Sequence, residues 1–408
     1  MKKFDLIVVG GGIAGVAASV SAAREGLSVL LVEKFGSLGG AMSNSLIFPF
    51  MGFTMNGGKR LLSDGIFTEM RKRKEEYNDS GWESYKFVFD DMVTEAGVNV
   101  LFHSSVFEAV CDGRNIKKIK VATKSGVIEF EADFFIDASG DGELIAMTGC
   151  DQQLGRESDN LCQPMTTCFR VSNVDIELFN KDREMLQQKY KEYREQKKIT
   201  NPRENILVFT GYAKGILHFN TTRVILHNPV DPFEISEAEI IARRQVYEMM
   251  CFLKENSKAF ENSSIISIAN HIGVRESRKL KGVHVLTGEE LKKCVRFEDS
   301  IALGNYCIDI HNPSGTGTEL YYFKAEEYYQ IPYRSLLPKE YDNMLVAGRC
   351  LSATHEAHSA VRIIPICACM GEAAGIAVAL AHQTGTNAHT VDIRAVRSKL
   401  KEKNAAID

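Results

Sequence analysis

The stretch IVVGGGIAGVAA, residues 7–18, decides the fold of this 408-residue chain. It carries the spacing GxGxxG from Gly10 onward, between an apolar run of strand length, Phe4–Val9, and a helical pattern, Ile13–Glu25. Glycines in such a turn let the backbone approach a phosphate group, whose charge is favourable at the positive end of the following helix. The pattern predicts a dinucleotide-binding turn of the Rossmann type.

A secretory signal is the alternative interpretation of this N-terminus, because Lys2 and Lys3 precede an apolar stretch. Asp5 and the consecutive glycines count against it, and a second predicted strand, Ser28–Glu33, follows without a cleavage site. Glu33 ends that strand where an acidic side chain binds a ribose diol, which disfavours the 2′-phosphate of NADP.

The overall composition is that of a globular protein, with 44% hydrophobic and 25% charged residues and a net charge of −4. This charge gives no electrostatic reason to expect nucleic acid or an anionic membrane as a partner. The ten cysteines form no CxxC pair, so we expect reduced thiols and a cytoplasmic location. The apolar stretch 363–381 has the length of a membrane span, but Pro365 and Glu372 favour a buried helix of a soluble protein.

The organisation along the chain predicts an α/β fold. Short strand-like runs between residues 98 and 137 indicate a β-meander, and an apolar strand at Asn343–Ala347 resembles part of the same unit. We expect a Rossmann-like domain with a β-meander, split in sequence into residues 1–150 and 331–408, and an inserted α+β substrate domain, residues 151–330. Helices are predicted at 59–77, 83–96, 174–198, 236–255 (with Ser236 as N-cap) and from 391 onward.

Four segments carry a resemblance to a known family. They are VVGGGIAGVAAS with LVEKFGSLGG (8–19 and 31–40), FFIDASGDGELIAMTG (134–149), HIGVRESRKLKGVHVLT (271–287) and IPYRSLLPKEYDNMLVAGRCLSATHEAHSAVRIIPICACMGEAAGIAVALA (331–381). In these the chain resembles the bacterial FAD-dependent oxidoreductases of the glutathione-reductase-like superfamily, relatives of the succinate dehydrogenase and fumarate reductase flavoproteins. Residues 171–264 are similar only in outline.

The resemblance implies that the split domain binds FAD. The implied FAD-binding positions are Gly10, Gly12, Gly15, Glu33, Lys34, Gly39, Gly40, Ala41, Val106, Ala138, Ser139, Gly140, Asp141, Gly348 and Arg349. Many members of the wider superfamily have an acidic residue that holds the ribityl chain where this chain has Arg349, so that role is not transferred. The arginine can instead stabilise an anionic flavin or a substrate carboxylate.

The densest group of titratable residues is THEAHSAVR, residues 354–362, just before the predicted flavin-facing helix. His355 or His358 is suited to move a proton as a hydride leaves the substrate, because the pKa of histidine lies near neutrality. The alternative is that both histidines only fix the loop. Arg362 is a candidate for orienting the substrate.

Two further arginines, Arg275 and Arg278, lie three residues apart, and guanidinium groups bind carboxylates or phosphates through paired hydrogen bonds. Glu276 between them leaves a structural ion-pair network as an equal alternative. Cys367 and Cys369 form a CxC pair that we interpret as buried and structural rather than redox-active. No metal site is expected. The loop HNPSGTGTE, 311–319, is either a substrate-recognition loop or a plain connection.

These observations favour an FAD-dependent oxidoreductase that transfers a hydride between flavin N5 and a small polar organic substrate, with an anionic substrate as one alternative. Missing motifs exclude a dithiol reductase and a separate NAD(P)H domain. A flavoprotein electron-transfer subunit of a redox complex is the second hypothesis, and a nucleic-acid-modifying flavoprotein the third. The electron acceptor is open, as are covalent attachment of the flavin and association into a homo-oligomer.

Overall fold

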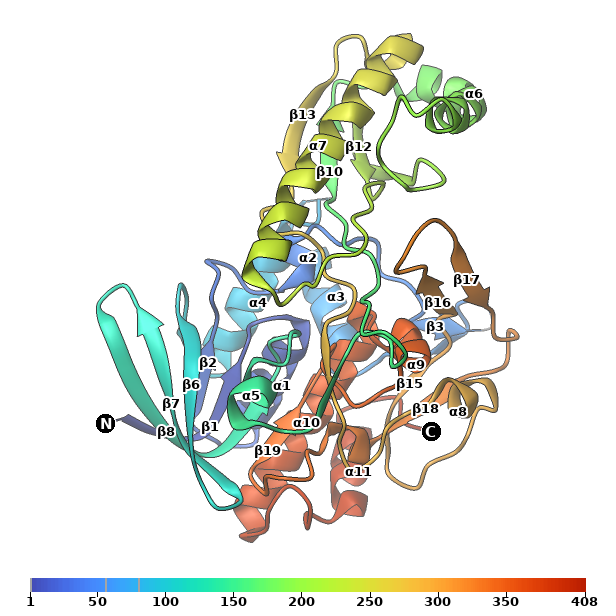
Figure 1. The fold of residues 1–408 in the computed structure, drawn as a ribbon. Coiled ribbons are helices and arrows are strands. Elements are labelled where there is room, and N and C mark those ends of the chain that lie inside the picture. The colour runs from blue at the N-terminus through green and yellow to red at the C-terminus, as the bar shows by residue number, and fades with distance from the viewer. Residues whose placement is uncertain (1, 56, 80) are drawn as a thin grey trace.

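The computed structural model describes residues 2–55, 57–79 and 81–408, and its largest sheet joins both ends of the chain (Figure 1). In spatial order its strands are β5 (Asn99–Leu101), β2 (Val29–Val32), β1 (Lys2–Val9), β8 (Gly126–Asp137), β7 (Asn115–Thr123) and β6 (Ser105–Asp112), and β19 (Met344–Val346) pairs with β8. The pairs among β5, β2, β1, β8 and β19 are parallel, whereas β6, β7 and β8 form an antiparallel meander. The predicted α/β class with a β-meander is confirmed.

Strand β8 is continuous, although the sequence predicts two shorter strands there, Gly126–Phe130 and Phe134–Asp137. Its first half pairs with β7 and its last three residues pair with β19. The predicted break does not occur because Glu131 and Ala132 continue the ladder with β1, opposite Lys3 and Phe4. One strand thus connects the meander to the parallel part of the sheet.

Helices and small two-stranded sheets surround this sheet. The helices are α1 (Ile13–Arg24), α2 (Ala41–Asn44), α3 (Ile66–Glu76), α4 (Ser84–Glu95), α5 (Glu143–Thr148), α8 (Gly288–Lys292), α9 (His355–Val361), α10 (Ile364–Thr384) and α11 (Ile393–Glu402). The small sheets pair β3 (Thr54–Met55) with β4 (Arg60–Leu61), β9 (Gln152–Leu154) with β14 (Arg278–Leu280), β15 (Ser300–Gly304) with β18 (Tyr329–Pro332), and β16 (Ile308–His311) with β17 (Thr318–Tyr321).

A lobe projects from this base and has a sheet of its own (Figure 1). Its strand order is β11 (Val208–Ala213), β12 (Ile216–Phe219), β10 (Phe169–Ser172) and β13 (Ser264–Ile268), and it also contains α6 (Ile176–Glu195) and α7 (Pro232–Asn256). The lobe has a separate apolar core, in which the rings of Phe169 and Phe219 stack at 4.8 Å. By contrast, apolar side chains from Leu280 to Ile331 join the core of the large sheet.

Two helix starts differ from the sequence expectation. Helix α7 begins at Pro232, because the side chain of Asp231 accepts hydrogen bonds from the N–H groups of Phe233 and Glu234. The expected N-cap, Ser236, instead donates to the carbonyl of Pro232 within the helix. Helix α3 begins at Ile66 rather than near residue 59, because residues 60–61 pair in strand β4.

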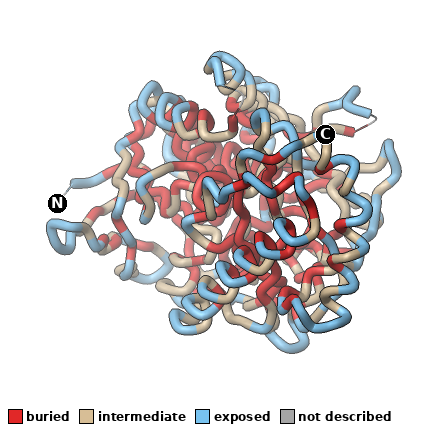
Figure 2. Tube along the Cα trace, turned by 90° about the horizontal axis from the view of Figure 1, so that it is seen from above, coloured by how far each residue is buried: buried red, intermediate tan, exposed pale blue. Residues whose placement is uncertain are grey.

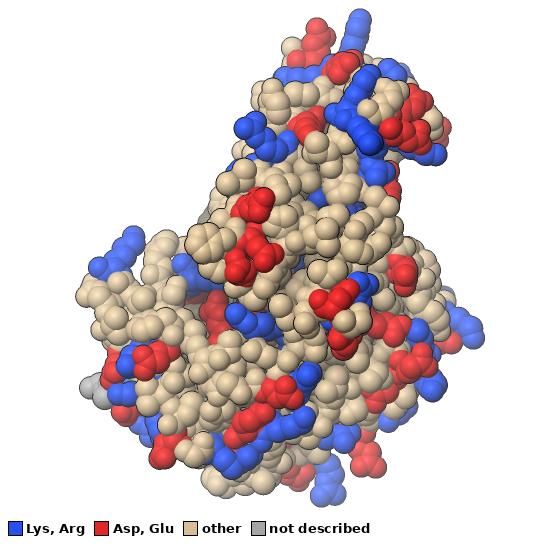
Figure 3. Space-filling view, in the orientation of Figure 1, with Lys and Arg blue, Asp and Glu red and all other residues tan. Residues whose placement is uncertain are grey.

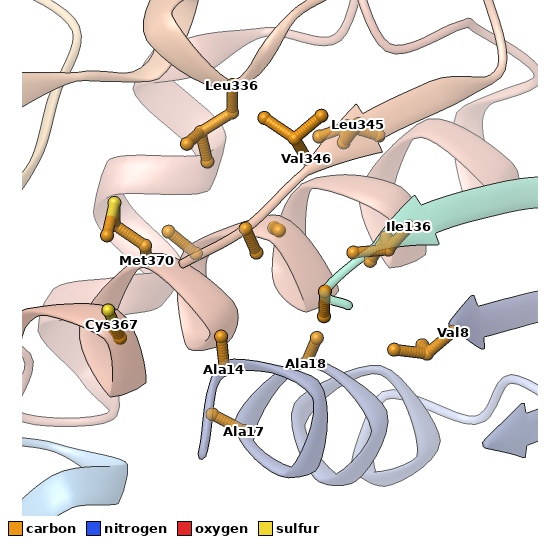
Figure 4. Close-up of a cluster of buried hydrophobic side chains, with 14 of the residues drawn as sticks. Val8, Ala14, Ala17, Ala18, Ile136, Leu336, Leu345, Val346, Cys367 and Met370 are labelled. Atoms are coloured by element: carbon orange, nitrogen blue, oxygen red, sulfur yellow. The ribbon is translucent and has the colours of Figure 1, made fainter. Parts of the chain in front are cut away.

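Helices α1 and α10 pack side by side with their backbones in close contact. A Cβ atom on Gly371 would lie 2.1 Å from the carbonyl oxygen of Ala14, and one on Gly375 would lie 2.3 Å from that of Ala18. Figure 4 shows Ala14 and Ala18 pointing from α1 toward α10 and β19. The small residues of both helices therefore allow an approach that larger side chains would prevent.

Helix α10 is long and apolar enough to cross a membrane, but 89% of its most apolar 18-residue window is buried inside the protein. Buried segments fill the centre of the molecule and exposed ones lie at its periphery (Figure 2). Within that centre, Glu372 of α10 accepts a hydrogen bond from the backbone N–H of Ile66 at the start of α3. Burial raises the pKa of Glu372 to about 8.

Gly371→Ala should lower the thermal unfolding midpoint, because the added methyl group meets the backbone of Ala14. In an unobstructed helix the same change stabilises by about 1 kcal/mol, whereas an overpacked helix contact costs about 1–3 kcal/mol. Calorimetry measures whether the unfolding midpoint falls, as overpacking predicts, or rises, as in an unobstructed helix. A higher midpoint would contradict the close contact between α1 and α10.

Glu372→Gln should remove a pH dependence of stability. The pKa of Glu372 is raised in the folded state, so its neutral form contributes stability at low pH that is lost as the pH rises from about 4.5 toward about 8. Gln is neutral throughout and keeps the acceptor for Ile66. Wild type should therefore lose stability relative to the variant by up to about 1.4 kcal/mol per pH unit across that window. Parallel melting profiles from pH 5 to 8 would show that Glu372 is ionised when buried.

Candidate cofactor and substrate site

One cavity of about 720 Å³ runs from the glycine-rich turn after β1 to the junction between base and lobe. It lies at the carboxyl ends of β1, β2, β8 and β19, where ligands bind in open α/β sheets. One end is lined by glycines and small residues. The other end is lined by arginines, aromatic residues and two carboxylates, Glu204 and Asp309.

The glycine-rich turn is held by contacts that tolerate no side chain at two of its three glycines. A Cβ on Gly10, whose φ is +99°, would lie 2.6 Å from the carbonyl oxygen of Ala138, and one on Gly15 would lie 1.9 Å from that of Gly10. Gly12 differs, because the nearest protein atoms would lie 3.9 Å from its Cβ. Gly10 and Gly15 are required by the protein, while the position of Gly12 faces space in the cavity.

Glu33 binds the same turn from the end of β2. Its Oε2 accepts a hydrogen bond of 2.6 Å from the N–H of Gly11, and its Oε1 accepts one of 2.8 Å from the N–H of Phe35. Each oxygen keeps a second lone pair, and Glu33 lines the cavity, so it remains able to accept from a ribose hydroxyl. Burial raises the pKa of Glu33, and the two backbone donors oppose that shift.

The small residues after β8 form the next wall, where Asp141 balances the charge of Arg349. The Arg349 guanidinium donates to Asp141 Oδ1 at 2.8 Å and to Ser277 Oγ at 2.8 Å. Burial opposes ionisation, but Arg349 and Lys34 together lower the pKa of Asp141. Arg349 therefore lines the cavity with its charge already paired.

Two helix N-termini reach the cavity without a side-chain cap. Helix α1 begins after Gly12 and α10 after Ile363, and neither N-cap residue accepts a side-chain hydrogen bond. Their free N–H groups and helix dipoles favour negative charge. In the same cavity wall, the side-chain amide nitrogen of Asn44 is buried and has no hydrogen-bond partner among the described residues. These donors suit an anionic, hydrogen-bonding ligand.

Arginines dominate the far end of the cavity. Arg203 from the lobe, Arg275 from the segment after β13, and Arg362 just before α10 all line it. None of the three forms an ion pair with a carboxylate within the residues that the structure describes. Burial and the neighbouring Arg362 and Arg203 lower the pKa of Arg275 to about 9. The three guanidinium groups thus outnumber the two carboxylates that line this end, Asp309 and Glu204, and Glu204 is paired with Arg223.

A chain of hydrogen bonds runs along the arginine-lined end of the cavity and includes the carboxylate of Asp309. Tyr306 donates to Asp309 Oδ2 at 3.1 Å, and His311 Nε2 lies 3.3 Å from that oxygen. Arg223 lies 3.1 Å from His311 Nδ1, and because arginine only donates, the proton of the neutral imidazole is on Nε2.

Burial and Arg275 lower the pKa of His311 to about 3. Burial disfavours the charged form of Asp309, but His311 and Arg362 lower its pKa well below the usual range.

Most sequence-predicted residues line this cavity. They are Gly10, Gly12, Glu33, Lys34, Gly39, Gly40, Ala41, Val106, Ala138, Ser139, Gly140, Asp141, Gly348 and Arg349 of the FAD set, and Arg275 and Arg362 of the catalytic set. Gly15, Arg278, His355 and His358 are not in its wall. Arg278 donates instead to the backbone carbonyl of Asp141 at 3.3 Å.

Both predicted proton carriers are buried in other settings. His358 donates from Nε2 to the carbonyl of Arg349 at 2.8 Å, and burial lowers its pKa well below the ordinary value. His355 Nδ1 lies 2.7 Å from Glu276, which also contacts Lys279. Burial opposes ionisation of Glu276, but His355 and Lys279 lower its pKa to about 2. The ion-pair network considered for Arg275 and Arg278 thus exists with different partners.

Sequence reasoning missed the residues that complete the polar end, Arg203, Tyr306, Asp309 and His311. The loop 311–319 was the available signal, since it connects β16 to β17 and its ends, His311 and Thr318, reach the cavity. Cys367 and Cys369 are buried, in agreement with the structural interpretation. Outside the cavity, Asp5, Asp133 and His382 bring three ligand atoms within 4.8 Å of one another, and each is partly exposed.

The fold and the cavity define a class: a flavoprotein with a Rossmann-like, glutathione-reductase-type nucleotide site. A comparison with family models is more specific. The chain belongs to the family described as FAD dependent oxidoreductase, whose model matches residues 5–400.

Individual relatives match only parts of the chain. Protein FixC of Azorhizobium caulinodans is 29% identical over 168 residues, which cover 35% of this chain and 38% of FixC. Glutathione reductase of Debaryomyces hansenii is 31% identical over 153 residues, covering 35% of this chain and 28% of the reductase. Among solved structures, the flavin-dependent brominase Bmp2 aligns with 97% of this chain and 83% of its own at 11% identity, with a TM-score of 0.50, which supports the shared fold alone.

The residues of the cavity fit the FAD that this family binds. Three features of the described residues suit an anionic dinucleotide. They are the open space that a side chain at Gly12 would occupy, the uncapped N-termini of α1 and α10, and the side-chain amide nitrogen of Asn44, which has no partner. The residues that would hold it are the FAD set named above, with Glu33 at the ribose.

Gly12→Val and Gly10→Ala should separate cofactor binding from folding. A Cβ atom at position 12 lies no closer than 3.9 Å to the neighbouring protein atoms and enters the cavity, so the variant should fold with an unchanged melting midpoint of the FAD-free form and lose FAD. Gly10→Ala meets the backbone of Ala138 at a positive φ, so it should also lower that midpoint. Absorbance of the purified proteins and calorimetry of the FAD-free forms measure both effects. A yellow Gly12→Val protein would contradict the assignment of the turn.

Proposed function

We propose that this protein oxidises or reduces a small substrate that carries an anionic group and, on the reacting carbon, a hydroxyl or amino group. The single observation that carries this proposal is the far end of the cavity, where Arg203, Arg275 and Arg362 have no carboxylate partner among the described residues and lie beside the ionised Asp309. Guanidinium groups bind carboxylates and phosphates, and a carboxylate accepts from a hydroxyl or an ammonium group.

The residues of the chain would bind and orient this substrate. The three arginines hold its anionic group, and Asp309 accepts a hydrogen bond from the hydroxyl or amine. Tyr306 and His311 both direct hydrogen atoms at Asp309 Oδ2, which leaves Oδ1 for the substrate. When bound, FAD accepts or supplies a hydride at N5. We do not assign the proton to His355 or His358, because neither lines the cavity.

The cysteines and the surface charge bear on the remaining proposals. All ten cysteines are unpaired, which supports the proposed cytoplasmic location. Lys, Arg, Asp and Glu are interspersed over the face in Figure 3, which does not favour the nucleic-acid alternative. An electron-transfer subunit is the second candidate, and it differs by needing a protein donor.

Anaerobic titration of the FAD-loaded enzyme tests the proposal. Absorbance of oxidised flavin should fall with a 2-hydroxy acid or an amino acid, but far less with the corresponding neutral amide. Equal reduction by acid and amide would overturn the anion requirement. Reduction only by a protein donor would favour the electron-transfer subunit.

Arg362→Gln should slow flavin reduction by an anionic substrate while FAD stays bound. The Arg362 side chain makes no hydrogen bond or ion pair within the described residues, so its loss costs little stability. Loss of a charged hydrogen bond of about 1.5–3 kcal/mol corresponds to a decrease in kcat/KM of about 10–100-fold. Arg296→Gln, which removes a surface arginine over Tyr328, is the matched control and should be unchanged. Equal rates for both variants would remove Arg362 from substrate binding.

A further inference from the structure

Helix α7 of the lobe exposes large apolar side chains along one face. Phe233 is 85% exposed, Ile240 58% and Tyr247 64%. They are seven residues apart, which places them on one stripe of the helix, at intervals of about 10 Å. The opposite face packs into the protein through Ala238, Ala242, Val246 and Met249. Single exposed apolar residues are ordinary, whereas three in heptad register are typical of a contact surface.

Charged residues flank this stripe in an order that favours pairing with α7 of a second chain in the antiparallel direction. Glu237 and Arg244 lie on the same side of the stripe, one turn on either side of Ile240. The Glu237 side chain is 68% exposed, and its Oε2 lies 3.5 Å from His227 Nε2. Arg244 is exposed and forms no ion pair within the described residues. A twofold axis at Ile240 would place Glu237 of each helix opposite Arg244 of the other.

The same axis also matches the apolar residues. Residues 233 and 247 are equally distant from 240, so Phe233 of each copy would meet Tyr247 of the other, and Ile240 would meet Ile240. One register therefore pairs every large apolar residue of the stripe and also pairs Glu237 with Arg244. Arg243, on the other side of the stripe, forms an ion pair with Glu239 of its own helix. Such a self-complementary patch is the requirement of a twofold-symmetric interface.

We propose that two copies of this chain associate by packing α7 antiparallel against α7, with the twofold axis at Ile240. The surface lies on the lobe, and no α7 residue lines the cavity, so pairing leaves the site accessible (Figure 1). Figure 3 shows largely uncharged surface over this part of the lobe, with acidic groups gathered toward its lower end. The mixture of acidic and basic residues beside the stripe does not favour an anionic membrane, which would select basic residues alone.

Sedimentation velocity of the FAD-loaded protein over a range of concentrations tests the proposal. Wild type should show a concentration-dependent dimer, and Ile240→Glu should sediment as a monomer while it keeps FAD. Val127→Glu is the matched control, because Val127 is 61% exposed on the hairpin between β7 and β8, and it should dimerise as wild type does. A monomeric wild type, a dimeric Ile240→Glu protein or an equal effect of Val127→Glu would each overturn the proposal.

Charge reversal tests the register. Glu237→Arg and Arg244→Glu should each weaken the dimer by at least tenfold, because each places two like-charged pairs at the interface. The double variant restores both pairs by symmetry and should recover the affinity of wild type. If α7 binds another protein but the chain does not associate with itself, another molecule covers α7. If the double variant does not recover the affinity of wild type, the helices do not pair in this register.

Discussion

The close contact between α1 and α10 is the constraint on which the site depends. Helix α1 follows the first strand and α10 comes more than three hundred residues later, yet their backbones touch at Gly371 and Gly375. Because both helices begin at the carboxyl edge of the sheet, this contact brings two uncapped N-termini to one cavity. A wider spacing would separate the two positive helix ends and leave the cofactor without one of them.

The nucleotide-binding end of the cavity could be predicted from the sequence, because each feature that forms it is a short local motif. The glycine turn, the acidic end of β2 and the small residues after β8 each have a spacing that only a dinucleotide site requires. The single continuous β8 and the early start of α7 were not predicted. In the first case ladder pairing with β1 continues through polar residues, and in the second Asp231 forms a better cap than Ser236.

The polar end of the cavity could not be predicted in the same way, because its residues come from unrelated segments. Arg203 lies in the lobe, Asp309 and His311 lie on β16, and Arg362 precedes α10. No spacing in the sequence connects them, and only the packing of lobe on base brings them together. His355 and His358, which the sequence predicts as proton carriers, do not line this cavity. Their motif is dense in titratable groups, but helix α9 directs them into the buried contacts with Glu276 and Arg349.

The distribution of charge in the cavity argues that ligand binding and lobe position are linked. Arg203 belongs to the lobe, whereas Arg362 belongs to the base. Both line the same cavity, and neither has a carboxylate partner in the part of the chain that the structure describes. Like charges in a partly buried site repel each other, and burial adds a cost for each of them. An anion between them removes the repulsion and is attracted by both parts at once. The same arginines would therefore hold the lobe against the base while an anion is bound between them.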